Sequence, residues 1–159
     1  MPPPKTTRED VLRLLDNDGF GNIVDGKLVS VSRQEQLDRA LALACEIGDL
    51  ELVKQLNKNG AVIHGNSEPL NVAAYYDHLR VAEFLLSHGA NVDGRARMFG
   101  ATPLMTAAGS ASLSVFRLLL TRGADPTAVD EEGASAFTWA MNGRHTALLA
   151  DSSVEPSVI

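Results

Sequence analysis

Apolar residues recur at helical spacing in short stretches that end at a glycine. In the clearest stretch, Val115, Leu118 and Leu119 occupy positions i, i+3 and i+4, which is the spacing of one face of an α-helix. Gly123 follows its last turn, where a left-handed residue is favoured and glycine has no Cβ to clash. Thr102–Pro103 supplies an N-cap and a first helical residue for the stretch before it. This pattern predicts a pair of short helices.

The same helical pattern repeats along the chain. Gly89 and Gly123 are 34 positions apart, and Pro69 and Pro103 have the same separation. Gly60 marks an earlier copy 29 positions before Gly89, so the link between the first two copies is shorter. A period of this size is typical of stacked repeats, because one helix pair cannot bury both of its faces. Four copies can be counted, and we expect them to stack into an all-α array.

At these residues the chain resembles the ankyrin repeat family, whose unit reads roughly G-x-TPLHxAA, a second helix, GAD and a hairpin loop. Residues 100–130 match TPL, AA, the LLL run and GAD in order, and the resemblance covers about residues 39–150. It implies an ankyrin-repeat solenoid of about four repeats, each a helix-turn-helix followed by a finger loop. The repeats that it implies span about 38–65, 66–96, 97–129 and 130–150.

The sequence departs from the family's pattern at two kinds of position. The histidine of TPLH is absent from every repeat, so the hydrogen bonds that it makes between fingers must be replaced. The residues in its place are Ala42, Asn71, Met105 and Thr138. The turn between the two helices commonly has glycine in this family, and here it has Asp77, Ala111 and Arg144. We expect a cost of up to about 1 kcal/mol at each of these turns where the backbone is left-handed.

An N-terminal helix is predicted ahead of the repeats. Two overlapping capping-box spacings, Thr6 to Glu9 and Thr7 to Asp10, precede an apolar stretch. In a capping box the two side chains bond to each other's backbone N–H groups. The predicted helix runs over about residues 8–16.

A β-hairpin and a longer helix are predicted next. Asp25–Gly26 is the preferred pair for a two-residue type I′ turn, and it separates candidate strands at 22–24 and 27–31. A further capping box begins at Ser32 and starts a helix over about 33–47. We expect the helix and hairpin to cap the array, since terminal repeats need a polar outer face. The expected organisation is a disordered segment 1–6, an N-terminal cap 7–31, an ankyrin repeat domain 32–150 and a disordered tail 151–159.

Composition and charge narrow the classes of partner. The 159 residues include 14 Lys plus Arg against 20 Asp plus Glu, a net charge of −6. This charge argues against binding to nucleic acid or anionic lipid, which needs clustered cations. No apolar stretch approaches the ~20 residues that span a bilayer, and the first residues do not resemble a signal peptide. The single Cys45 cannot form an internal disulfide. We expect a monomer inside the cell, in the cytoplasm, with the nucleus as the alternative.

The sequence contains no local signature of an enzyme or metal site. It has no GxxxxGKS phosphate loop, no GxSxG elbow and no GxGxxG motif. The four histidines have no metal-ligand spacing, and Asp16-x-Asp18 fails as a calcium loop because Lys27 stands where a Glu should close the site. We therefore expect no metal and no cofactor.

The resemblance places ligands in the concave groove between the first helices and the finger loops. Exposed aromatic and arginine side chains are typical of interface hot spots. We therefore expect a non-catalytic adaptor or regulatory module that binds another protein or peptide there. The alternative for the aromatic residues is that one tyrosine packs on its neighbouring repeat and Phe99 tucks under the hairpin. We interpret Trp139 as closing the core. The expected partner-binding residues are Tyr75, Tyr76, Arg95, Arg97, Met98, Phe99, Ser110, Glu131, Glu132 and Asn142.

A second functional class stays open at this point. The N-terminal extension and the short first link are more than a plain adaptor needs. They motivate a small enzyme or small-molecule binder with a pocket between the extension and the groove. Its acid, base or orienting groups would come from His64, Tyr75, Tyr76, Asp77 and His78.

Overall fold

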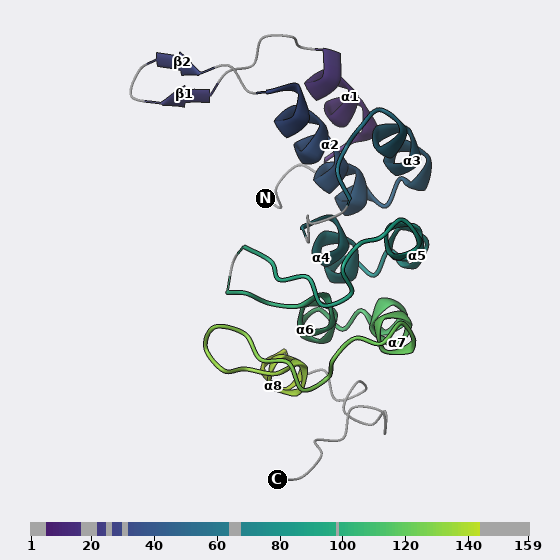
Figure 1. Cartoon of the computed structure of the whole chain (residues 1–159), viewed down its shortest axis with the longest axis vertical. Coiled ribbons are helices and arrows are strands. Elements are labelled where there is room, and N and C mark those ends of the chain that lie inside the picture. The colour runs from purple at the N-terminus through teal and green to yellow at the C-terminus, as the bar shows by residue number, and fades with distance from the viewer. Residues whose placement is uncertain are drawn as a thin grey trace. The chain divides into compact units, whose positions relative to one another are not determined.

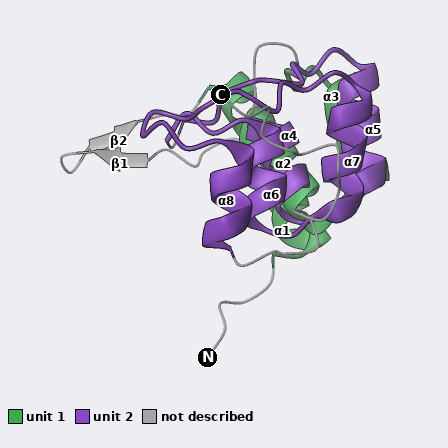
Figure 2. Ribbon diagram, turned by 90° about the horizontal axis from the view of Figure 1, so that it is seen from below, with its two compact units in different colours: residues 1–62 green, residues 63–159 purple. Residues whose placement is uncertain are grey.

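Short helices of 7 to 15 residues make up most of the described chain. The computed structural model describes residues 6–16, 22–24, 27–29, 32–63, 68–97 and 99–143. The chain divides into two compact units, residues 1–62 and residues 63–159, which Figure 2 shows in different colours. Within the described ranges, none of the helices has the length and apolar character needed to cross a bilayer.

Unit 1 contains an N-terminal helix, a hairpin and a helix pair. Its elements are α1 (Arg8–Asp16), β1 (Asn22–Val24), β2 (Lys27–Val29), α2 (Arg33–Ile47) and α3 (Leu50–Lys58). The two strands pair antiparallel, with Val24 opposite Lys27. These elements confirm the predicted helix over 8–16, the paired strands of the hairpin and the long helix that begins at Arg33. Residues 30 and 31 of the predicted second strand lie outside the described residues.

Helix α2 packs against both α1 and α3. Val11 on α1, Leu41 on α2 and Leu52 on α3 are buried. Cys45 is buried as well, and burial raises the pKa of its thiol because desolvation disfavours the thiolate. The cysteine is therefore a core residue.

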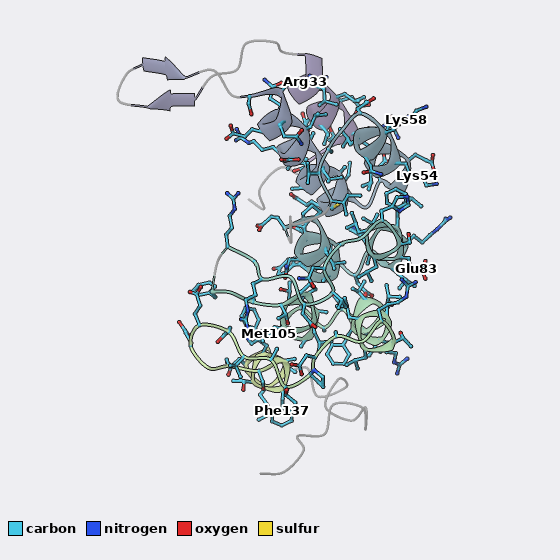
Figure 3. The ribbon with its side chains drawn as sticks, in the orientation of Figure 1. Arg33, Lys54, Lys58, Glu83, Met105 and Phe137 are labelled. Carbon is cyan, nitrogen blue, oxygen red and sulfur yellow. The ribbon has the colours of Figure 1, made fainter. Side chains whose placement is uncertain are left out.

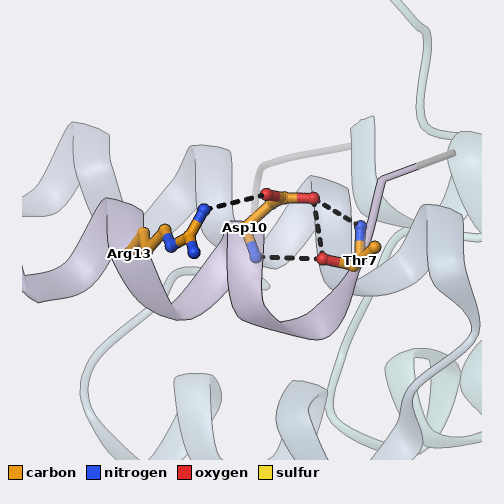
Figure 4. A network of polar contacts seen from close by, with 3 residues as sticks. All are labelled: Thr7, Asp10 and Arg13. Atoms are coloured by element: carbon orange, nitrogen blue, oxygen red, sulfur yellow. Dashed lines mark hydrogen bonds and ion pairs between the residues drawn. The ribbon is translucent and has the colours of Figure 1, made fainter. Parts of the chain in front are cut away.

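Helix α1 begins with the second of the two predicted capping boxes (Figure 4). Thr7 Oγ1 accepts a hydrogen bond from the backbone N–H of Asp10 at 3.3 Å, and the Asp10 carboxylate accepts one from the N–H of Thr7 at 2.9 Å. The Thr7 hydroxyl also donates to that carboxylate at 2.7 Å. These bonds to Thr7, with a smaller contribution from Arg13, lower the pKa of Asp10. Thr6 instead donates to Glu46 on α2.

The described part of unit 2 contains two complete helix pairs and the first helix of a third. Its elements are α4 (Glu68–Tyr75), α5 (Leu79–Ser87), α6 (Pro103–Gly109), α7 (Leu113–Thr121) and α8 (Ala136–Asn142). Helices α4, α6 and α8 lie side by side in one layer, and α5 and α7 form a second layer (Figure 1). This is the all-α repeat stack that the sequence predicts.

Alanines let the first helices of unit 2 approach one another closely. Ala74 on α4, Ala107 and Ala108 on α6 and Ala140 on α8 are almost completely buried. Met105 on α6 is also buried, whereas Phe137 on α8 is half-buried at the last described helix (Figure 3). Small side chains permit close packing between helices, and each repeat is stabilised by its neighbour.

Left-handed backbone occurs where the repeat pattern predicts it. Gly89 and Gly123, after the second helices of their repeats, have φ of 87° and 84°. Asp77 and Ala111, which stand in turns where the family prefers glycine, have φ of 56° and 60°. Arg144, the third such position, lies outside the described residues.

Other side chains replace the family's missing histidine. Asn71 donates to the carbonyl oxygen of Gly94 in the finger at 3.2 Å, and the Thr106 hydroxyl of the next repeat donates to Asn71 Oδ1 at 2.9 Å. In the next repeat the sulfur of Met105 accepts from the N–H of its N-cap residue, Thr102, at 3.4 Å. Asn71 thus supplies a replacement bond to the finger, whereas the bond of Met105 stays within the cap of its own helix.

Several predicted features lie outside the described residues. They are the turn at Asp25–Gly26, the second helix of the fourth repeat, the tail 151–159 and all of the segment 1–6 except Thr6.

The two left-handed turns should respond differently to glycine. Ala111→Gly should raise the free energy of unfolding by up to about 1 kcal/mol, because glycine removes the Cβ clash at φ 60°. Asp77→Gly relieves the same strain but also removes the hydrogen bond that the Asp77 carboxylate accepts from the N–H of Val115 at 2.9 Å. It should therefore bring no gain. Denaturant unfolding of both variants checks this, and equal stabilisation would contradict the role given to the Asp77 carboxylate.

Candidate functional site

A pocket of about 350 Å³ opens between the first helices and the finger loops of unit 2. This volume lies at the lower end of the range for ligand sites, roughly 300–1,000 Å³. Aromatic rings, carboxylates and small residues line it together, and we call it the groove pocket. Its lining residues are Tyr75, Phe99, Thr106, Gly109, Asp130, Glu132, Ala134, Trp139, Asn142 and Gly143.

The C-terminal ends of three first helices meet at the groove pocket. Tyr75, Gly109 and Asn142 are the last residues of α4, α6 and α8, and all three line it. The C-terminus of a helix carries partial negative charge, because its last carbonyl groups lack helical partners. The stacking of the repeats thus gathers three such ends at one place.

Two finger loops form the other side of the pocket, and hydrogen bonds tie them together. We call residues 91–101 the first finger and residues 125–135 the second finger. The Arg95 guanidinium donates to the carbonyl oxygens of Gly100 and Val129, both at 2.8 Å. The backbone N–H of Glu131 donates to the carbonyl oxygen of Phe99 at 3.0 Å. Arg95 therefore acts as a link between fingers.

Phe99 adopts a backbone conformation that a bulky residue rarely takes. Its φ is 61°, and its side chain is 51% exposed while lining the pocket. The next residue, Gly100, also has positive φ, and a Cβ there would lie 3.0 Å from Cγ of Glu131. Left-handed backbone costs a non-glycine residue roughly 1–2 kcal/mol. The fingers thus hold a strained aromatic residue at the surface, and the alternative in which Phe99 tucks under the hairpin is not observed.

Asp130 organises the second finger. Its carboxylate accepts hydrogen bonds from the backbone N–H groups of Ala134 at 2.8 Å and Glu132 at 3.0 Å. The indole N–H of Trp139 donates to the same carboxylate at 2.8 Å. The bond from Trp139 contributes most to lowering the pKa of Asp130, followed by the bond from Ala134, with smaller contributions from Glu132 and Arg95. Asp130 is therefore ionised at neutral pH.

The ring of Trp139, on α8, lies against Gly109 at the end of the neighbouring first helix, α6. A Cβ at Gly109 would come within 2.8 Å of Cε3 of the indole, so glycine there makes room for the ring. Trp139 is half-buried and lines the groove pocket. The interpretation of Trp139 as a residue that closes the core is therefore incomplete, because its ring also forms a wall of the pocket.

The structure brings together some of the residues predicted to bind a partner. Tyr75, Phe99, Glu132 and Asn142 line the groove pocket. Five others are described but do not line it, namely Tyr76, Arg95, Arg97, Ser110 and Glu131. Met98 lies outside the described residues.

The expected partner-binding residues do not include the remaining lining residues: Thr106, Gly109, Asp130, Ala134, Trp139 and Gly143. One available signal was a large side chain in one repeat matched by a glycine in the neighbouring repeat. Trp139 occupies the position that Thr106 holds in the repeat before it, and Gly109 supplies the space for the larger ring.

The residues considered for acid–base chemistry do not form one cluster in the part of the chain that the structure describes. Tyr75 lines the groove pocket, whereas the Asp77 carboxylate binds the N–H of Val115 in the next repeat. The rings of Tyr76 and His78 stack on each other with centroids 6.0 Å apart, and His64 lies outside the described residues. The described ranges also contain no cluster of three or more His, Cys, Asp or Glu side chains able to hold a metal.

The family model for ankyrin repeats in three copies matches residues 10–96 and 41–130. The chain belongs to the ankyrin repeat family. Ankyrin repeats are protein–protein interaction modules. The chain is similar to the ankyrin repeat protein nuc-2 of Neurospora crassa, with 30% identity over 86% of this chain. It is also similar to the ankyrin repeat and KH domain-containing protein mask-1 of Caenorhabditis elegans, with 33% identity over 65% of this chain. The chain spans only 14% and 4%, respectively, of the lengths of these relatives.

Gly109→Ala should displace the indole of Trp139, because the new Cβ would lie 2.8 Å from the ring. Trp139 is the only tryptophan of the chain, so its fluorescence reports this change directly. We expect a shifted emission maximum with little change in helix content by circular dichroism. An emission spectrum identical to the parent's would contradict the packing described for the two residues.

Asp130→Asn should destabilise the protein in a pH-dependent way. Hydrogen bonds hold the folded-state pKa of Asp130 below its ordinary value of 3.8. Its stabilising contribution is therefore present above about pH 4 and is lost as the pH falls through the lower, folded-state pKa. The difference in Tm between parent and variant should be largest near neutral pH and shrink in acid. Glu132→Gln is the control, since it removes a charge from the same finger and leaves the bonds of Asp130 in place.

Proposed function

We propose that this protein is a non-catalytic interaction module that binds a segment of another protein along the groove pocket. A single observation carries the proposal. The fingers hold the exposed ring of Phe99 against the pocket in a left-handed conformation that stability alone disfavours. Strain of this kind is typical of binding sites, because such a site needs particular side chains at the surface even where their backbone conformation costs stability.

The composition of the pocket supports this function. Tyr75 and Phe99 are 57% and 51% exposed, and together with Trp139 they surround one cavity. Aromatic anchors of this type dominate the binding energy of protein interfaces. The hydrogen bonds of Arg95 and Glu131 fix the fingers before a partner arrives, and pre-organisation lowers the entropic cost of binding.

The same composition favours binding over catalysis. Apart from Tyr75, the ionisable residues that line the pocket are Asp130 and Glu132. The Asp130 carboxylate accepts three hydrogen bonds and is kept ionised, which suits a fixed charge better than a proton donor. We propose in addition that the protein works as a monomer inside the cell, in the cytoplasm or nucleus, and its net charge of −6 argues against nucleic acid as the partner.

Phe99→Gly should separate binding from stability. Glycine relieves the left-handed strain, so the free energy of unfolding should stay within about 1 kcal/mol of the parent's or rise. Loss of the ring should weaken partner binding at least about tenfold. Affinity capture with the full chain and with Phe99→Gly, followed by measurement of Kd for each protein that is lost, tests the proposal.

Two variants complete this experiment. Tyr75→Ala should lose the same partners as Phe99→Gly, whereas Arg97→Ala should retain them because Arg97 is in the first finger but outside the pocket lining. Equal capture by parent and Phe99→Gly would refute the proposal. Loss of a metabolite alone would favour the small-molecule alternative.

A further inference from the structure

The groove pocket combines aromatic faces with negative charge from several sources. Tyr75, Phe99 and Trp139 contribute the rings, and Asp130 and Glu132 contribute the carboxylates. We propose, on the basis of the function proposed above, that the partner segment inserts a cationic side chain, Lys or Arg, among these rings and carboxylates. The partner is thereby defined by its chemistry as well as by the surface that it binds.

Aromatic rings attract cations through the negative potential of their faces. The attraction is strongest for tryptophan and increases when the cation is removed from water. Three rings around a single cavity can also contact the apolar stem of a long side chain. Both effects favour Lys or Arg over a short polar residue.

The two carboxylates serve the cation in different ways. Three N–H donors hold Asp130 in place, so it acts as a fixed negative charge in the wall. Glu132 is exposed and lines the same pocket, so its carboxylate can meet the charged end of an incoming side chain. Charge-assisted contacts of this kind are among the stronger hydrogen bonds.

The helix ends add to the negative potential. The pocket is lined by Tyr75, Gly109 and Asn142, which end α4, α6 and α8. A cation near a helix C-terminus interacts favourably with the last carbonyl groups. These three ends are brought together only by stacking of the repeats, and their contribution does not depend on Asp130 or Glu132.

Among the described residues, the cation Arg95 lies close to this site. Arg95 offsets part of the charge of Asp130, and its guanidinium is committed to the carbonyl oxygens of Gly100 and Val129. It does not line the pocket. Arg95 therefore leaves the space between the rings and Glu132 to a partner's side chain.

The volume also fits this occupant. A cavity of about 350 Å³ accommodates one long side chain with part of the backbone that carries it. The partner recognised by this chemistry is a protein segment with a single Lys or Arg as its anchor.

Selection of displayed short random peptides on the full chain tests the inference. Peptides that contain no tryptophan are chosen, because Trp139 is then the only tryptophan in the complex and its fluorescence reports Kd. We expect the selected peptides to share one Lys or Arg. Replacement of that residue by norleucine, which is uncharged and has a similar stem, should weaken binding at least about tenfold. Trimethyllysine at the same position should also bind more tightly than norleucine.

A pair of variants tests whether the carboxylate of Glu132 contributes to binding. Glu132→Gln should weaken the binding of the peptides that carry Lys or Arg about three- to tenfold. Glu131→Gln is the matched control, because it removes the same charge from the neighbouring position, which does not line the pocket, and it should change Kd less than twofold. Equal effects of the two variants would overturn the inference, since they would indicate only the general charge of the finger.

The remaining outcomes separate this inference from the proposed function. Peptides with an apolar anchor that bind the parent but not Phe99→Gly would overturn the cationic partner and leave the groove as a protein-binding site. If no selected peptide depends on Phe99, both proposals fail.

Discussion

The close packing of one repeat's first helix against the next is the constraint on which unit 2 depends. Ala107 and Ala108 on α6 are fully buried, and larger side chains there would separate the layer. Hydrogen bonds across the same boundary, from Thr106 to Asn71 and from the N–H of Val115 to Asp77, hold neighbouring repeats in register. Because one helix pair cannot bury both of its faces, these boundaries determine whether the array is stable and where its surfaces lie.

The pocket is a direct consequence of that stacking. Successive first helices end at the same side of the layer, so their last residues become neighbours although they are far apart in sequence. The two fingers are brought together in the same way, and Arg95 joins them through backbone carbonyl oxygens. Stability and presentation then compete at Phe99, whose left-handed backbone costs free energy while its ring lines the pocket.

The family accounts for the framework, and the chain's own departures from it account for the pocket. The relatives with which it shares 30–33% identity are much longer proteins, of which it spans 4–14%. The unusual residues lie where this chain differs from the repeat pattern. Trp139 stands where the preceding repeat has Thr106, and Gly109 makes room for it. We infer that binding specificity resides in such substitutions, since the repeat scaffold itself is common to many proteins.

The sequence alone determined the local structure of this protein. Thr102 caps α6, Ser32 caps α2, and Asp77 and Ala111 take left-handed backbone, because each feature depends on interactions within a few residues. The exposed Tyr75 and Phe99 were also predictable, since the repeat pattern assigns residues to its helix ends and loops. The role of Trp139 and Asp130 was decided only by the tertiary structure. Their hydrogen bond fastens the second finger to α8, and the ring's contact with Gly109 and the convergence of three helix ends join separate repeats. Such contacts are set by packing distances that spacing along a chain does not encode.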